Sequence, residues 1–219
     1  MAKASRYYVF DAFGTLFDVH SAVREHGAAL GPVSSRLSDI WRAKQLEYTW
    51  INAGLNRHIP FREATRQGLL YALAVCELDP AIAPRLLAAY QRLQAYGEVP
   101  GVLHRLKADG AKLAILSNGD TDMLDDIVNN AGLTGVFDAV ISAGVAGTFK
   151  PVPKVYALAT EAFGVAAADI TFLSSNRWDI AGAKAFGFKC IWVNRSGAPD
   201  EYPDLSADAV VANLSPLAA

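Results

Sequence analysis

Tyr8-Val9-Phe10-Asp11-Ala12-Phe13-Gly14-Thr15-Leu16 is the stretch that decides the fold of this chain. It begins with aromatic and β-branched residues, which are typical of a buried strand. The Asp-x-x-Gly-Thr that follows is typical of a turn. The stretch therefore predicts a strand that presents the carboxylate of Asp11 at one edge of a sheet, where open α/β folds place their chemistry. A carboxylate in that position can be a metal ligand, a base or a nucleophile.

The segment after this strand, from about residue 19 to residue 96, has helical periodicity and almost no strand signal. Within it, Ser38-Asp39 precedes residues 40–51, and this pattern predicts a capped amphipathic helix. The residues predicted to share its apolar face are Ile40, Leu46 and Trp50.

Beyond residue 97, short apolar strands alternate with helices. Strands are predicted at residues 112–117, 136–141, 170–174, 188–193 and 209–211, and helices at 120–130, 153–163 and 179–186. This alternation predicts a parallel sheet with helices on both faces. We therefore predict an α/β fold: a Rossmann-like, doubly wound, mostly parallel sheet with an inserted all-helical cap subdomain. Residues 1–17 and 98–219 form the predicted core, and residues 18–97 the cap.

Composition restricts the class of protein. The 219 residues are 52% hydrophobic and 19% charged, which predicts a compact globular protein. The net charge of −2 and the pI near 6.1 argue against nucleic acid or an anionic membrane as partner. Cys76 and Cys190 lack a metal-type spacing, and no apolar run reaches transmembrane length. The first residues lack the apolar region of a secretory signal, so we expect a reduced, cytoplasmic protein.

Polar residues follow four of the predicted strands or their connections. Because the carboxyl ends of strands converge on one crevice in a doubly wound sheet, we expect these groups to form a single site. One such turn would be weak evidence, since Ser, Asn and Gly are ordinary turn formers. The four groups are Asp11 with Thr15, Ser117-Asn118-Gly119, Lys150 before Pro151, and Ser174-Ser175-Asn176-Arg177-Trp178-Asp179.

These four groups, with the inserted helices, resemble the signatures of the haloacid dehalogenase superfamily over essentially the whole chain. More narrowly, residues 10–18, 41–50 and 174–179 resemble the L-2-haloacid dehalogenases. The resemblance implies hydrolytic dehalogenation of short-chain L-2-haloalkanoic acids to D-2-hydroxy acids. It implies an aspartyl ester on Asp11, inversion at C2, no metal and no other cofactor. It also implies a homodimer.

The residues themselves argue against a phosphatase of the same superfamily. A phosphoryl-transferring relative needs a second Asp two residues after the nucleophile, and Phe13 occupies that position. Such a relative also holds Mg²⁺ with paired carboxylates in the fourth group, because this cation takes several oxygen ligands. Here Ser174-Ser175-Asn176 replaces the leading acid and leaves Asp179 alone. Phosphatase chemistry is disfavoured on both counts.

Carbon chemistry suits the remaining groups. A carboxylate such as Asp11 can displace halide from C2 of a 2-haloacid and form an ester, which water then cleaves. Lys150 would compensate the negative charges and keep Asp11 ionised. Ser117 and Asn118 would donate to the carboxylate of the substrate.

The resemblance assigns the remaining roles. Arg42 on the cap would receive the departing halide, and Asp179 would activate the water. Residues expected to orient that water are Thr15, Ser174 and Asn176. Asn176 and Trp178 are expected beside the halide, and Tyr156 in hydrogen-bonding contact with the site. The expected apolar wall consists of Phe13, Leu46, Trp50 and Phe61.

Two positions depart from the pattern of the L-2-haloacid dehalogenases. Phe13 stands where Tyr is frequent, and Arg177 stands where a small or apolar residue is usual. An inward Arg177 would add a cation to the site, whereas an outward one would leave the site unchanged. The sequence leaves the preferred halide and chain length open.

Each candidate residue also has a structural alternative as a turn former, a helix cap or a surface side chain. Three rival functions stay open. The same ester mechanism could open the ring of azetidine-2-carboxylate, the chain could be a Mg²⁺-dependent small-molecule phosphatase, or it could be a catalytically inert binding protein.

Overall fold

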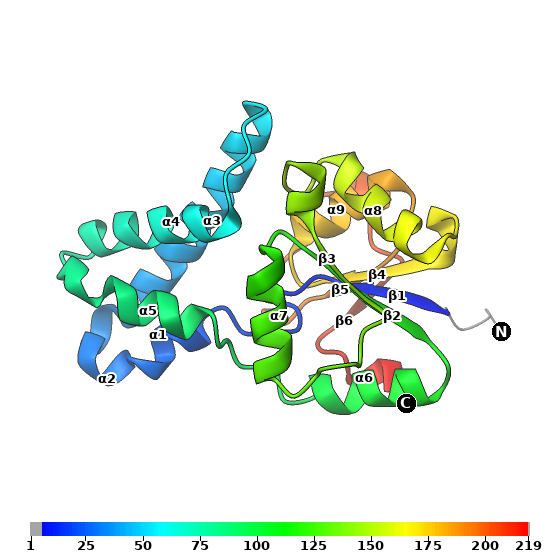
Figure 1. Cartoon of the computed structure of the whole chain (residues 1–219), viewed down its shortest axis with the longest axis horizontal. Helices are drawn as coiled ribbons and strands as arrows, with labels where there is room; N and C mark the ends of the chain where they lie inside the picture. The colour runs from blue at the N-terminus through cyan, green and yellow to red at the C-terminus, as the bar shows by residue number, and fades with distance from the viewer. Residues whose placement is uncertain (1–5, 219) are drawn as a thin grey trace.

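The computed structural model describes residues 6–218, which contain a six-stranded sheet with the order β3-β2-β1-β4-β5-β6 (Figure 1). All neighbouring strands are parallel. The chain winds outward from β1 first on one side and then on the other, so the predicted doubly wound α/β fold is confirmed. The strands are β1 (Tyr7–Phe10), β2 (Lys112–Ser117), β3 (Ala139–Ser142), β4 (Ile170–Ser174), β5 (Lys189–Val193) and β6 (Ala209–Val211).

Helices cover both faces of the sheet, as the alternating side chains of the strands require. In β1, Tyr8 and Phe10 belong to one hydrophobic cluster and Val9 to the other. The first cluster includes side chains of α6 (Val99–Ala108) and α7 (Thr121–Asn130) and continues into the cap. The second includes side chains of α8 (Pro153–Phe163) and α9 (Arg177–Phe186).

Each predicted element of the core is present, and four of them have boundaries one to three residues from the predicted ones. The helix predicted from residue 120 begins at Thr121, and the strand predicted from residue 188 begins at Lys189. The strand predicted from residue 136 begins at Ala139, because the side chain of Asp138 takes the place of a backbone carbonyl as hydrogen-bond acceptor. Its carboxylate accepts from the Leu113 N–H at 2.9 Å, while its own N–H donates to the Leu113 carbonyl. The helix predicted from residue 179 begins at Arg177.

The cap consists of helices that follow β1 in the chain and lie to one side of the sheet (Figure 1). At Gly68 the backbones of α3 and α4 approach so closely that an added Cβ would lie 3.0 Å from the Gln45 nitrogen. A side chain at residue 68 would therefore push the two helices apart. The cap helices are α1 (Ser21–Glu25), α2 (Gly27–Leu30), α3 (Ser34–Gly54), α4 (Phe61–Val75) and α5 (Ala83–Tyr90).

Two predictions for α3 are wrong. The helix begins at Ser34, one turn before the predicted cap. The predicted apolar face is only partly buried, and Trp50 is 40% exposed. The buried face includes three polar side chains with hydrogen-bond partners, which an apolar pattern does not reveal. Its members are Leu37, Ser38, Trp41, Gln45 and Thr49.

Two antiparallel linker segments join the cap to the core. Phe17 forms a bridge with Ala95, and the Tyr96 N–H donates to the Leu16 carbonyl at 3.0 Å. The guanidinium of Arg195, from the segment after β5, donates to the Thr15 carbonyl at 2.8 Å. The predicted division at residues 18 and 97 falls in these linkers, and we retain it as a proposal.

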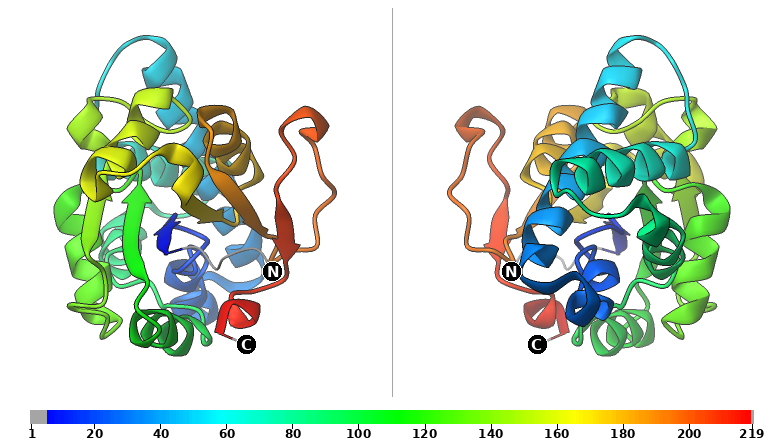
Figure 2. Two further views of the ribbon diagram at one scale, coloured as in Figure 1. Left: turned by 90° about the vertical axis from the view of Figure 1, so that its right-hand side faces the viewer. Right: turned by 90° about the vertical axis from the view of Figure 1, so that its left-hand side faces the viewer.

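A long connection between β5 and β6 extends from the sheet as an arm (Figure 2). Arg177 anchors it. Its Nε donates to Asp200 at 2.6 Å, and its Nη2 donates to the carbonyls of Tyr202 and Leu205. Arg177 therefore lies under the arm and away from the predicted site, which is the outward alternative left open by the sequence.

Candidate active site

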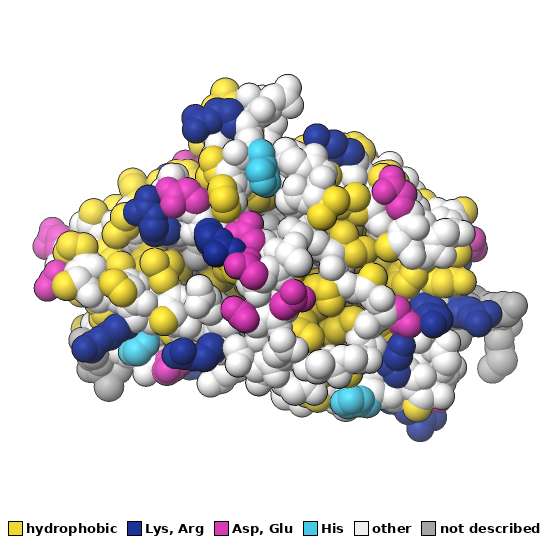
Figure 3. Space-filling view, in the orientation of Figure 1, with side chains coloured by type: hydrophobic (Ala, Val, Ile, Leu, Met, Phe, Trp, Pro, Cys, Tyr) yellow, Lys and Arg dark blue, Asp and Glu magenta, His cyan; other side chains and the backbone are white. Residues whose placement is uncertain are grey.

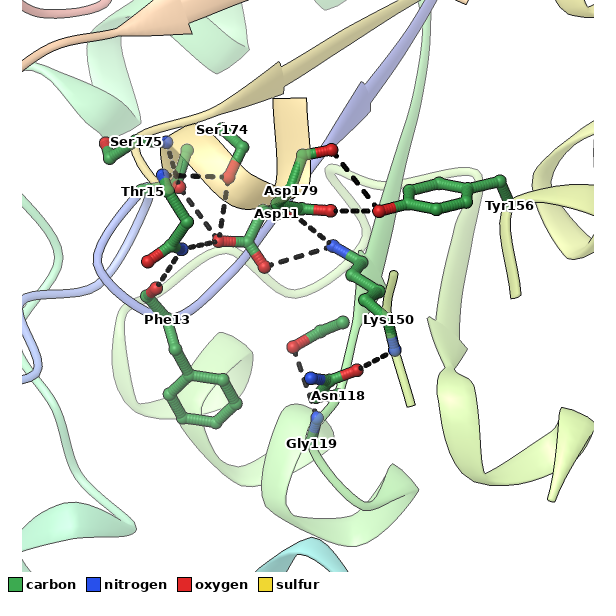
Figure 4. Close-up of polar contacts among 12 residues, drawn as sticks. Asp11, Phe13, Thr15, Asn118, Gly119, Lys150, Tyr156, Ser174, Ser175 and Asp179 are labelled. Atoms are coloured by element: carbon green, nitrogen blue, oxygen red, sulfur yellow. Dashed lines mark hydrogen bonds and ion pairs between the residues drawn. The ribbon is translucent and has the colours of Figure 1, made fainter. Parts of the chain in front are cut away.

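Asp11 follows β1 at the carboxyl edge of the sheet, and its side chain is buried (Figure 4). Its two oxygens have different partners. Oδ2 accepts from Asn176 Nδ2 at 2.8 Å, from Thr15 Oγ1 at 2.9 Å and, more weakly, from Ser174 Oγ at 3.4 Å. Oδ1 accepts from Lys150 Nζ at 3.2 Å. Both sides of the strand-order reversal, at β1 and β4, thus contribute to one site.

Lys150 lies between two carboxylates, and its side chain is 1% exposed. Its Nζ lies 3.2 Å from Asp11 Oδ1 and 2.8 Å from Asp179 Oδ2 (Figure 4). The backbone N–H of Lys150 donates to Asn118 Oδ1, which fixes the loop before the side chain. A buried ammonium is stable only when it is paired, and two carboxylates satisfy it here.

Asp179, in the first turn of α9, is fully buried. Tyr156 donates to its Oδ1 at 2.8 Å, while Lys150 donates to its Oδ2. Burial raises the pKa of Asp179 to about 6; the nearby Asp11 charge adds to the rise, and Lys150 and Tyr156 act against it. Asp179 is therefore a carboxylate that can exchange a proton near neutral pH.

A small pocket opens beside Asp11 between the core and the cap. The core supplies its polar side and the cap supplies Arg42 and apolar side chains, a combination that suits a small ligand with one charged end. Its lining residues are Asp11, Phe13, Arg42, Leu46, Phe61, Ser117, Asn118, Asn176 and Trp178. These include each residue predicted to contact substrate except Trp50 and Tyr156, and the Tyr156 hydroxyl lies behind Asp179 within the core.

Arg42, on α3, reaches from the cap to the core. Its Nη2 donates to Asn176 Oδ1 at 3.2 Å and to the Phe13 carbonyl at 3.3 Å. Its Nη1 donates to Gln45 Oε1 at 2.8 Å. One guanidinium therefore links cap and core at the edge of the pocket.

Apolar rings form the wall opposite these polar groups. Phe13 lies against Phe61 and against Tyr90, with ring centroids 5.2 and 5.6 Å apart. Trp50 packs edge-on against Trp178 at 5.5 Å and does not belong to the pocket lining, unlike the sequence-based expectation. Trp50 lies near the C-terminal end of α3, where the helix face predicted to be apolar is exposed to solvent.

Two residues near the site, Gln45 and Tyr90, were not predicted, and a third belongs to a predicted group. Gln45 and Tyr90 are buried beside Arg42, and Gly119 lies directly under Phe13. Gly119 belongs to the predicted Ser117-Asn118-Gly119 group, so its place near the site was expected from the sequence. No sequence pattern marks Gln45 and Tyr90, because they lie 45 residues apart in the chain and meet only when their helices pack together.

The chain belongs to the haloacid dehalogenase-like hydrolases, whose family model matches residues 6–187. The predicted superfamily is thus confirmed, as is the expectation that the chain is a hydrolase. The sequence groups on which the resemblance rested supply Asp11, Lys150 and Asp179, which lie together in the structure.

Characterised relatives are similar over most of their length. Haloacetate dehalogenase H-2 of Moraxella sp. (strain B) is 43% identical over 211 residues, with 92% of this chain and 94% of the relative covered. An (S)-2-haloacid dehalogenase of Pseudomonas sp. (strain YL) is 42% identical, with 94% of this chain and 89% of the relative covered. The solved L-2-haloacid dehalogenase of Xanthobacter autotrophicus with chloropropionic acid covalently bound is 37% identical, with a TM-score of 0.85 and 98% and 97% coverage.

The molecular surface carries charges of both signs. Basic and acidic side chains are interspersed on the face shown in Figure 3. In the described part of the chain, no helix combines the length and apolar character that a membrane span requires.

Proposed function

We propose that this chain is an (S)-2-haloacid dehalogenase. It hydrolyses short-chain L-2-haloalkanoic acids to D-2-hydroxy acids through an ester on Asp11, without a metal or other cofactor. The observation that carries the proposal is the unequal bonding of the two Asp11 oxygens. Among the described residues, Oδ2 has donors from Thr15, Ser174 and Asn176, whereas Oδ1 has only Lys150.

The first step is displacement at carbon. Oδ1 of Asp11, the oxygen with fewer hydrogen-bond partners, donates an electron pair to C2 of the substrate. The carbon–halogen bond breaks at the same time, and its electron pair leaves with the halide. Attack occurs opposite the halide, so the configuration at C2 inverts. The ammonium of Lys150, 3.2 Å from Oδ1, compensates the negative charge of Asp11 beside the negatively charged substrate.

The pocket supplies a partner for each end of the substrate. Ser117 and Asn118 lie on the core side and receive the substrate carboxylate. Arg42 comes from the cap and meets Asn176 of the core, near Trp178, and its positive charge stabilises the departing halide. Phe13, Leu46 and Phe61 enclose the short alkyl group.

The second step is ester hydrolysis. Asp179 takes a proton from a water molecule whose oxygen attacks the carbonyl carbon of the Asp11 ester. The negative charge then develops on Oδ2, where Thr15, Ser174 and Asn176 already donate and so act as an oxyanion hole. Collapse of this intermediate breaks the bond between the carbonyl carbon and Oδ1, which leaves on C2 of the product. The product alkoxide takes the proton held by Asp179, and Asp11, now carrying the oxygen of the water, loses its remaining proton to solvent and is a carboxylate again. A base with a pKa near 6 suits the activation of water at neutral pH.

The donor set also supports catalysis without Mg²⁺. Asp11 and Asp179 both bind the ammonium of Lys150, which already supplies the positive charge between them. A divalent cation bound by the same oxygens would have to displace this buried lysine. Phe13, at the position of a phosphatase acid, offers no ligand or proton.

Halide release from L- and D-2-chloropropionate, measured separately with a chelator present, tests the proposal. We expect chloride only from the L enantiomer and D-lactate as product. Asp11→Asn should retain less than about a thousandth of the activity, since it removes the nucleophile. Chloride release that depends on Mg²⁺, or a fully active Asp11→Asn variant, would overturn the proposal. Parallel assays with azetidine-2-carboxylate and phosphate esters test the rival reactions.

We also propose a homodimer that uses the exposed side of α3 and α4. Large apolar side chains gather there on both helices, whereas Trp41 of the same cap is buried internally. Light scattering combined with size-exclusion chromatography tests this, and a mass near 23.4 kDa at micromolar concentration would contradict it. The exposed residues are Trp50, Ile51, Leu55, Leu70, Tyr71 and Val75.

A further inference from the structure

Gln45 is a fully buried polar residue in the cap with a complete set of partners. Its Nε2 donates to Thr65 Oγ1 at 2.7 Å and lies 3.1 Å from the Tyr90 hydroxyl. Its Oε1 accepts from Arg42 Nη1 at 2.8 Å. A buried amide is stable only with such partners, so this arrangement holds α3, α4 and α5 in one geometry.

The neighbours of Gln45 determine which way its amide faces. Thr65 Oγ1 donates its single proton to the Phe61 carbonyl at 2.8 Å. It can therefore only accept from Gln45, and the amide NH₂ must face Thr65. The amide oxygen then faces Arg42, as the guanidinium requires, since a guanidinium has no acceptor. A buried network thus presents one acceptor oxygen to Arg42.

The guanidinium of Arg42 is hydrogen-bonded to the cap through one nitrogen and to the core through another. Nη1 is bound to Gln45 in the cap, while Nη2 faces the pocket beside Asn176 and the Phe13 carbonyl. A long arginine side chain has many rotamers, and fixing one in advance lowers the cost of using it in the reaction. The bond to Gln45 fixes the Nη1 end of the guanidinium.

We propose that Gln45 is a positioning residue that holds Arg42 in the orientation needed to receive the departing halide. The inference rests on the proposed dehalogenation and extends it to a residue that does not line the pocket. Gln45 belongs neither to the pocket lining nor to the polar contacts of Asp11. It acts on the halide through Arg42.

Tyr90 extends the same arrangement to the apolar wall. Its ring stacks on Phe13 at 5.6 Å with an interplanar angle of 16°, while its hydroxyl lies within hydrogen-bond distance of Gln45. Burial raises the pKa of Tyr90, so its hydroxyl keeps its proton at neutral pH. Tyr90 therefore couples the position of Gln45 to the position of Phe13.

The test compares Gln45→Met with Thr49→Val. Gln45→Met keeps the side-chain length and removes the hydrogen bonds of the amide to Thr65, Arg42 and Tyr90. Thr49→Val removes a buried hydroxyl from the same face of α3, one turn further on, whose bond goes to the Leu46 carbonyl. Both variants are assayed by thermal unfolding and by single-turnover halide release from L-2-chloro- and L-2-bromopropionate.

We expect Gln45→Met to slow chloride release about tenfold or more, because a misplaced group at the reacting centre is costly. Bromide release should slow less, since bromide is the better leaving group and needs less help from Arg42. KM should change little, and Thr49→Val should stay within about twofold of the parent rate with both substrates. Tyr90→Phe, which retains the ring, should show a smaller effect with the same halide dependence.

Equal slowing with both halides, or slowing matched by Thr49→Val, would overturn the positioning role. If Gln45→Met fails to fold, Tyr90→Phe decides by the same halide ratio. If the parent protein releases no halide, the proposed function fails. A crystal structure of Gln45→Met then still decides whether Gln45 positions Arg42. An unmoved guanidinium refutes the inference, and a displaced one supports it.

Discussion

The Tyr156 hydroxyl donates to Asp179 Oδ1 across 2.8 Å in the interior of the core, where neither residue is exposed to solvent. An added Cβ on Gly182 would lie 2.5 Å from the same hydroxyl oxygen, so the absence of a side chain there permits the contact. Tyr156 therefore acts on the site through Asp179 and not through substrate.

Removing this hydroxyl should change the pH dependence of the second step. The Tyr156 bond lowers the pKa of Asp179, in opposition to burial. In Tyr156→Phe the acidic limb of the single-turnover hydrolysis rate should therefore move to higher pH, by about 1 unit. A pH–rate profile from pH 4.5 to 9 measures the shift. Tyr8→Phe, which changes a buried phenol on β1, should leave the profile in place.

Gly119 determines how closely the Ser-Asn-Gly turn approaches the apolar wall. An added Cβ would lie 2.7 Å from Phe13 Cε2 and 3.0 Å from Leu124 Cδ2. Gly119→Ala should push the Phe13 ring into the pocket, raise KM and lower kcat/KM about tenfold. Gly119→Ala/Phe13→Leu should recover part of the loss. In Gly101→Ala, on α6, the new methyl has open space, so steady-state kinetics should remain those of the parent.

Much of the core was predictable because each strand is short, apolar and bounded by turn residues. β2, β4, β6 and α8 have the predicted limits. Asp11, Lys150 and Asp179 were predictable as one cluster because parallel strands bring their carboxyl ends to a common edge.

The cap was less predictable because its buried face is partly polar. Gln45 and Thr49 are buried by virtue of their hydrogen bonds, and no periodicity of apolar residues marks such positions. The contact of Tyr156 with Asp179 could not be predicted from the sequence either. Its place in the chain indicated proximity to the site, but only the packing of α8 against α9 shows that it contacts Asp179 instead of the pocket.

Asp138 should stabilise the start of the sheet in a pH-dependent way. Its partial burial acts to raise its pKa, but bonds from Lys107, the Leu113 N–H and Lys112 outweigh this and lower the pKa to about 2. A carboxyl with a lowered folded-state pKa adds stability above its unfolded pKa, near 4, which is lost as the pH falls towards 2. Asp138→Asn should therefore lower the free energy of unfolding by about 1–2 kcal/mol at pH 7.

Urea unfolding at several pH values checks this expectation. The difference between Asp138→Asn and the parent should shrink steadily below pH 4, and a difference independent of pH would contradict the assigned cause. Asp109→Asn provides the comparison, because its pair with Arg105 is exposed on both sides and should contribute little.

Lys150 should be as important for stability as for catalysis. Lys150→Met would leave Asp11 and Asp179 buried without their shared cation, a change that costs about 3–5 kcal/mol at pH 7. The pKa of Asp179 is already raised to about 6 by burial, and losing Lys150 should raise it further. An acid whose pKa is raised in the folded state destabilises the protein above that pKa, and protonation relieves the penalty.

The destabilisation by Lys150→Met should therefore be smaller at pH 5 than at pH 8. The double variant Lys150→Met/Asp179→Asn should recover a large part of the loss at pH 8 without recovering halide release. Lys184→Met, which removes a partly exposed partner of Asp208, should cost no more than about 1 kcal/mol. Equal destabilisation of Lys150→Met at both pH values would mean that lost packing, and not unpaired charge, explains the effect.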